Sequence, residues 1–281
     1  MIPFNFQYVK PKTVPEAFEQ YFIYKNQDKK PFYMSGGTEL ITLGRLNIVH
    51  TNGVIDLKGI PEYSSMFFHE QYLYIGGGTP LTIIEDANLF PLLSQTVSEI
   101  ADRTARNKIT LAGNICAQIF YREAVLPLLI SDCYIGIAGP EGIIYHPINN
   151  VFNKELQLHE GQYIFSILIE KTNTTLPFVT IKRRRQGDNG YPLVTVAATK
   201  KDQDIRLAIS GLCPFPFRSF EMEKELNEKT LPVEERVNKA LEFIPGPVLN
   251  DVEGSAEYRI FVLKNTMTDI IKELEGDHDG R

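Results

Sequence analysis

Cysteine is scarce in this chain of 281 residues, where only Cys116, Cys133 and Cys213 occur. They are far apart and form no CxxC pair, so the sequence favours neither a disulfide framework nor a zinc site. A [2Fe–2S] cluster usually takes four cysteine ligands, so this chain alone is not expected to hold one. The histidines also lack metal-ligand spacing, and no metal site is predicted.

Long apolar runs and a surplus of positive charge are missing too. No stretch of about 18 apolar residues could span a bilayer, and the N-terminus lacks the basic and apolar regions of a signal peptide. The net charge is -6, whereas nucleic-acid binding needs a dense positive surface. We therefore expect a cytoplasmic protein with no membrane span and no nucleic-acid partner, whose hydrophobic content of 43% suffices for a substantial core.

The first part of the chain alternates helices and strands. Thr13 and Glu16 have the spacing of a helix-capping box, and apolar residues then recur at helical intervals. Strands are predicted at residues 31–34 and 53–57, with a further helix between them. This order indicates an α/β arrangement.

The rest of the chain divides at a polar run, residues 171–177. Before this run, Thr82 and Glu85 indicate a second capping box. The elements expected there are strands at 72–75, 134–138 and 164–170 and helices at 92–101 and 126–130. After it, we expect strands at 178–182, 193–199 and 205–211, then charged amphipathic helices at 221–227, 233–243 and 255–275.

Two glycine-rich turns follow predicted strands in the first half. Residues 35–40 are Ser35, Gly36, Gly37, Thr38, Glu39 and Leu40. Glycines let the backbone approach a ligand, and free N–H groups at a helix start favour a phosphate. The pattern is not the GxGxxG of a dinucleotide site, and an ordinary tight turn is the alternative. The turn at residues 76–79 is the weaker candidate, because such a strand end is commonly structural.

A third motif combines a hydroxyl, a glycine and an amide within five residues. Thr110, Gly113 and Asn114 could hydrogen-bond a nucleotide from several directions. Glu123 follows nine positions later, as an acceptor for ribose or ribityl hydroxyls or, alternatively, as a solvated acid at a helix start.

One basic cluster occurs, at residues 182–185. It is either a charged strand edge that discourages aggregation or a place where Lys182 points inward near a cofactor, with the arginines at a polar or partner-facing surface. No nucleophile elbow or Cys/His nucleophile pattern is visible, and no catalytic acid or base is predicted.

Together, the motifs at 35–40 and 106–115 resemble the two flavin loops of the FAD-binding medium subunits of the xanthine dehydrogenase and carbon monoxide dehydrogenase family. The resemblance covers most of the chain and extends to residues 178–211 and 253–263. It implies an α+β protein: a two-subdomain α/β FAD-binding domain (PCMH-like), then a smaller α+β domain with a three-stranded antiparallel sheet and helices. The implied ranges are 1–172, with subdomains of about 1–58 and 59–172, and 176–281.

The resemblance also implies a flavin site. Residues 35–40 would cradle the pyrophosphate, and Thr110, Gly113 and Asn114 would line the other side. Glu123 stands where the family usually has Asp, Lys182 matches a lysine that approaches the flavin in some members, and Ile164 would pack against the ring.

The implied role is electron transfer within a molybdenum hydroxylase complex. A molybdopterin-binding large subunit and a [2Fe–2S] small subunit would be partners, and FAD would pass electrons to NAD or another acceptor. Ala112 replaces a usual glycine, Ile109 occupies a position that is usually small, and residues 121–127 are longer than the common version. A stand-alone FAD oxidoreductase and an assembly subunit that has lost FAD are the alternatives.

Overall fold

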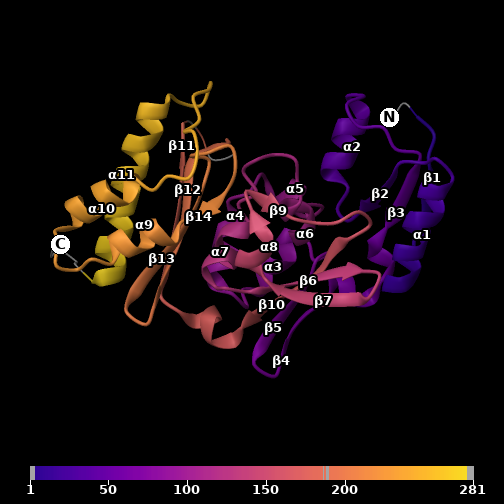
Figure 1. Ribbon diagram of the computed structural model, residues 1–281, viewed down its shortest axis with the longest axis horizontal. Coiled ribbons are helices and arrows are strands. Elements are labelled where there is room, and N and C mark those ends of the chain that lie inside the picture. Colours follow the sequence, from indigo (N-terminus) through magenta and orange to yellow (C-terminus); the bar gives the residue numbers. More distant parts are fainter. Residues whose placement is uncertain (1–3, 186, 188–189, 277–281) are drawn as a thin grey trace.

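The computed structural model describes residues 4–185, 187 and 190–276, arranged as three units along the long axis of the molecule (Figure 1). The N-terminal unit lies at one end, the middle unit in the centre, and the C-terminal unit at the other end. Each unit has its own sheet, and the sheets fall within the predicted ranges 1–58, 59–172 and 176–281. The domain boundaries themselves stay a prediction.

The N-terminal unit is a three-stranded parallel sheet with two helices. Its strands β1 (Gln7–Val9), β2 (Pro31–Met34) and β3 (Gly53–Asp56) are in the order β1-β3-β2. The Thr13 hydroxyl caps α1 (Val14–Asn26) by accepting from the Glu16 amide, as predicted. The second helix is α2 (Thr38–Arg45). Three residues, Ser35, Gly36 and Gly37, separate it from β2, and the rest of the first glycine motif forms its first turn.

The middle unit is built on a five-stranded antiparallel sheet. In sheet order its strands are β4 (Met66–His69), β5 (Tyr72–Gly76), β10 (Tyr163–Glu170), β6 (Tyr134–Gly139) and β7 (Gly142–Pro147). The helices are α3 (Leu81–Ala87), α4 (Pro91–Ser98), α5 (Arg103–Arg106), α6 (Leu111–Ile115), α7 (Val125–Ile130) and α8 (Ile148–Val151). Leucine and isoleucine side chains from the helices and the sheet form a common core.

The capping box expected at Thr82 is wrong. Helix α3 starts at Leu81 with Pro80 in the cap position, two residues before the expected cap, so Thr82 lies inside the helix. The start is set by a tertiary contact, because the Leu81 amide donates to the Ile109 carbonyl over 2.9 Å.

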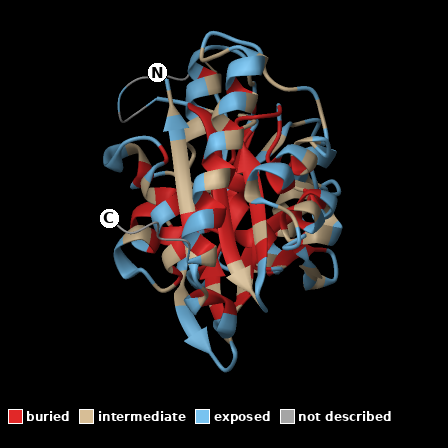
Figure 2. Cartoon of the chain, turned by 90° about the vertical axis from the view of Figure 1, so that its left-hand side faces the viewer, coloured by how far each residue is buried: buried red, intermediate tan, exposed pale blue. Residues whose placement is uncertain are grey.

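The C-terminal unit is an antiparallel sheet covered by helices. Strands β11 (Phe178–Arg184), β12 (Pro192–Lys201) and β13 (Asp204–Ser210) are the three predicted ones, and the short β14 (Phe217–Arg218) adds a fourth. Helices α9 (Phe220–Leu226), α10 (Val233–Leu241) and α11 (Ala256–Glu275) follow. Figure 2 looks onto this unit and shows buried strands behind helices whose outward faces are exposed. In the part of the chain that the structure describes, no helix is long and apolar enough to cross a membrane.

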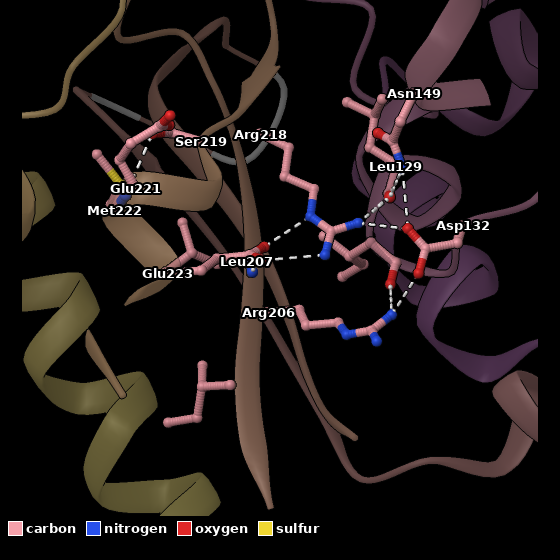
Figure 3. A network of polar contacts seen from close by, with 12 residues as sticks. Leu129, Asp132, Asn149, Arg206, Leu207, Arg218, Ser219, Glu221, Met222 and Glu223 are labelled. Carbon is pink, nitrogen blue, oxygen red and sulfur yellow. Dashed lines mark hydrogen bonds and ion pairs between the residues drawn. The ribbon is translucent and has the colours of Figure 1, made fainter. Parts of the chain in front are cut away.

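A buried arginine joins the C-terminal unit to the middle unit (Figure 3). The Arg218 guanidinium donates to both carboxylate oxygens of Glu223, over 2.7 and 3.0 Å. It also donates to Asp132 over 2.6 Å and to the Leu129 carbonyl over 2.8 Å, at the end of α7. Arg206 adds a 2.6 Å contact to the other oxygen of Asp132. Because Arg218 satisfies groups of both units at once, it fixes one against the other.

Candidate functional site

The two predicted flavin loops lie against each other, although they are far apart in the sequence. The Ser35 and Thr110 hydroxyl oxygens are 2.7 Å apart, within hydrogen-bonding distance. Gly36 packs so closely on the second loop that an added Cβ would lie 1.9 Å from the Lys108 carbonyl oxygen. Only glycine fits at this position. The first motif is therefore more than an ordinary turn, because its backbone packs directly on the second loop.

The first loop ends in a helix start that suits an anion. Gly37 occupies the cap position of α2 with φ 75°, and among the described residues no side chain caps this helix. The first N–H groups of a helix have no partner within it and carry partial positive charge. A phosphate group can satisfy them, so the uncapped Gly37 turn fits the pyrophosphate of FAD. Nearby, the Lys58 ammonium donates to the Ser35 carbonyl over 2.6 Å and so anchors the first residue of the loop.

The second loop forms the short helix α6 and is held by its own motif residues. The Thr110 hydroxyl accepts from the Gly113 amide over 3.3 Å and so caps the helix. The Asn114 side-chain oxygen accepts from the Ala124 amide over 3.1 Å. Both side chains therefore shape the loop, whatever further contact they make with a ligand.

The glycine turn at residues 76–79 supports this second loop. The Thr79 and Gly77 carbonyls accept from the Leu111 and Ala112 amides, over 3.0 and 2.9 Å. A Cβ on Gly77 would lie 2.9 Å from the Ala112 Cβ, and Ala112 is itself buried. The methyl group of Ala112, which stands where the resemblance implies glycine, therefore packs toward this turn.

Glu39 bridges from the first loop to the segment after α6. Its carboxylate accepts from the Gln118 amide over 2.9 and 3.0 Å and from the Ile119 amide over 3.2 Å. Thr38 and Leu40 flank it in the first turn of α2. The sequence offered no signal for the amides that Glu39 binds, because they lie 79 and 80 positions away.

Glu123 and Lys182 form a buried ion pair, with 2.9 Å between the ammonium and a carboxylate oxygen. The other oxygen of Glu123 accepts from the Thr195 hydroxyl over 2.6 Å, and Lys182 also donates to the Glu99 carbonyl over 2.8 Å. Glu123 is 5% exposed, which excludes a solvated helix start. Lys182 points inward, which agrees with one of the two interpretations of the basic cluster, and its partner Glu123 is itself one of the predicted site residues.

The remaining arginines of the basic cluster are engaged as well. Arg183 pairs with Asp269 and Arg184 with Glu99, over 3.2 and 2.7 Å. Arg185 donates to the Val252 carbonyl. Strand β11 is thus an edge strand whose charged side chains are paired within the chain. Arg183, for example, pairs with Asp269 of α11.

Ile164 lies in the core beneath the loops rather than on an open surface. It is 2% exposed, and its carbonyl lies where a Cβ on Gly77 would meet it, at 2.9 Å. The structure gives it a packing role beside the supporting turn, and contact with the flavin ring stays a prediction. Within the described ranges, no group of three or more metal-ligating side chains occurs.

Comparison with known proteins identifies the relatives of this chain. Residues 4–170 match the family described as "FAD binding domain in molybdopterin dehydrogenase". The glyceraldehyde dehydrogenase medium chain of Sulfolobus acidocaldarius is 24% identical over 98% of this chain and 100% of its own length. The carbon monoxide dehydrogenase medium chain of Hydrogenophaga pseudoflava is 24% identical over 78% of each chain.

Solved structures share the fold across nearly the whole chain. A chain of carbon monoxide dehydrogenase from Hydrogenophaga pseudoflava superposes with a TM-score of 0.87 at 20% identity, covering 98% of this chain and 99% of that one. A chain of quinoline 2-oxidoreductase from Pseudomonas putida 86 gives 0.82 at 19% identity, with the same coverage. The family match spans more than half of the sequence, so this chain belongs to the FAD-binding domain family of molybdopterin dehydrogenases.

Proposed function

We propose that this chain binds one FAD between its two loops and transfers electrons within a molybdopterin-dependent hydroxylase or dehydrogenase complex. The observation that carries the proposal is the uncapped start of α2 at Gly37, next to a loop fitted around Gly36. FAD, when bound, accepts and releases electrons, and the protein positions and tunes it. In this proposal residues 35–40 hold the pyrophosphate, and Thr110, Gly113 and Asn114 line the opposite side.

The proposed assignment of the cofactors to different subunits follows from the cysteines of this chain. Its three cysteines are separate residues, one exposed and two buried, so the proposed [2Fe–2S] clusters belong to a small subunit and the molybdopterin to a large subunit. The names of the relatives fit such an assembly, since they are called medium chains. NAD as final acceptor, a xanthine dehydrogenase-like complex and a cytoplasmic location belong to the same proposal.

A stand-alone flavoenzyme is the rival, and isolation of the native complex separates the two functions. We expect the chain to co-purify with molybdenum- and iron-containing subunits, whereas the FAD-loaded chain alone turns over none of the complex's substrate. NADH should bleach the flavin of the isolated chain if NAD is the acceptor. Substrate oxidation by the isolated chain at the rate of the complex would favour the rival.

A further inference from the structure

The segment 116–124, which follows the second flavin loop, contacts all three units of the fold. On the N-terminal side, the amides of Gln118 and Ile119 donate to Glu39 of α2. On the C-terminal side, Glu123 accepts from Lys182 of β11 and Thr195 of β12. The nine-residue segment is thus held through the Glu39 carboxylate of the N-terminal unit and through its own Glu123 carboxylate, which binds the C-terminal unit.

The middle unit holds the same segment through its backbone. Within the segment, the Arg122 guanidinium donates to the Ala117 carbonyl over 2.7 Å, and it also reaches the Lys154 carbonyl of the middle unit over 3.0 Å. The Ala124 amide donates to Asn114 of the second loop. Any shift of the segment is therefore passed directly to Asn114, one of the residues proposed to line the cofactor.

The groups that the Glu39 carboxylate binds matter for the anion site at the start of α2. A carboxylate in the first turn of a helix is attracted to that helix's own N–H groups. Here it is turned to the Gln118 and Ile119 amides instead, which disperse its charge through charge-assisted hydrogen bonds. The first-turn amides of α2 stay available, and the carboxylate is directed at protein rather than at a phosphate.

We propose that Glu39, although it lies within the loop 35–40, is a positioning residue: its carboxylate acts on the cofactor site through the segment 116–124 and does not itself touch the cofactor. The inference rests on the proposed function, in that the cofactor is FAD. Because coupling between two sites is reciprocal, FAD should order this segment, and loosening the segment should weaken FAD binding.

The test compares Glu39→Ala and Glu39→Gln with the full-length wild-type chain and with Glu19→Ala, which alters an exposed acid of α1. Hydrogen exchange of peptides spanning 116–124 is measured with and without FAD, alongside FAD titration and the visible circular dichroism of the bound flavin. In Glu39→Ala, the charge-assisted bonds to two amides are lost. We therefore expect exchange in the FAD-free segment to be about tenfold faster and FAD binding severalfold weaker. Glu39→Gln retains one acceptor oxygen and should restore part of both.

The outcomes are separable. Equal melting temperatures with an altered flavin dichroism in Glu39→Ala would support a positioning role, since global unfolding is then excluded. Weaker FAD binding with unchanged exchange at 116–124 would overturn the proposal and make Glu39 a direct ligand. A folded wild-type chain that binds no FAD would refute the proposed function, while the exchange of the FAD-free variants would still decide whether Glu39 orders the segment.

Discussion

Gly36→Ala is expected to weaken FAD binding by at least about 100-fold, or ~2.7 kcal/mol. The reason is steric: the new methyl carbon would lie 1.9 Å from the Lys108 carbonyl oxygen, which belongs to backbone and cannot rotate away. The two loops must separate to accommodate it, and the hydroxyl contact between Ser35 and Thr110 is lost with them. A binding site formed between two loops does not survive their separation.

The matched control is Gly142→Ala at the start of β7. Gly142 has φ 93° and nothing within 4 Å of an added Cβ, so the substitution costs only backbone strain of about 1–2 kcal/mol. Fluorescence titration of FAD into both variants, with circular dichroism to verify folding, makes the comparison. FAD affinity of Gly36→Ala equal to that of Gly142→Ala would contradict the loop-junction site.

Arg218→Met is expected to lower the free energy of unfolding by about 3–5 kcal/mol, because it leaves a buried carboxylate without its partner. The Arg218 side chain is 4% exposed and that of Glu223 10%. Burial raises the pKa of Glu223, and the guanidinium beside it opposes this rise. The same substitution also deprives the Leu129 carbonyl at the end of α7 of a donor, so the middle and C-terminal units lose a shared contact.

Urea denaturation measures this effect, with Arg103→Met as the control. Arg103 also forms a bidentate pair, with Asp86, but more than half of its side chain is exposed, and solvent screens such a pair. We expect no resolvable change in its denaturation midpoint. Equal decreases in the free energy of unfolding of the two variants would show that burial does not set the strength of the Arg218 network.

The loss in Arg218→Met should depend on pH with a defined sign. Without the guanidinium, the folded-state pKa of Glu223 rises further above its unfolded value. The folded state then binds more protons than the unfolded state, so stability falls as pH rises through the folded pKa. The free energy of unfolding of the variant should therefore be closest to that of the wild type in mildly acidic buffer and furthest below it in alkaline buffer.

Local patterns predicted the parts of the site that consist of neighbouring residues. The glycines at 36 and 37 follow a strand and precede a helix, and alternation and capping signals are enough to place them there. Thr110, Gly113 and Asn114 likewise form one short helix whose cap is encoded in the motif itself. Strands β2, β3, β5, β6 and β10 to β13 were predicted for the same reason. Strands β1, β4, β7 and the two-residue β14, each at an edge of its sheet, were not predicted.

Contacts between distant residues could not be predicted this way. Glu123 and Lys182 are 59 positions apart, and each had a separate local interpretation until the fold placed them in one ion pair. At Thr82 the local signal was misleading, because the pairing of Leu81 with Ile109 sets where α3 begins. Tertiary contacts decide such positions, and a single sequence does not display them.

FAD titration into the purified wild-type chain, followed by visible absorbance, tests the central claim most directly. We expect one FAD per chain, with a flavin spectrum that differs from that of free FAD because the ring leaves water. A folded chain that takes up no FAD would contradict the account, since the uncapped start of α2 and the fitted loops would then serve some other ligand or none.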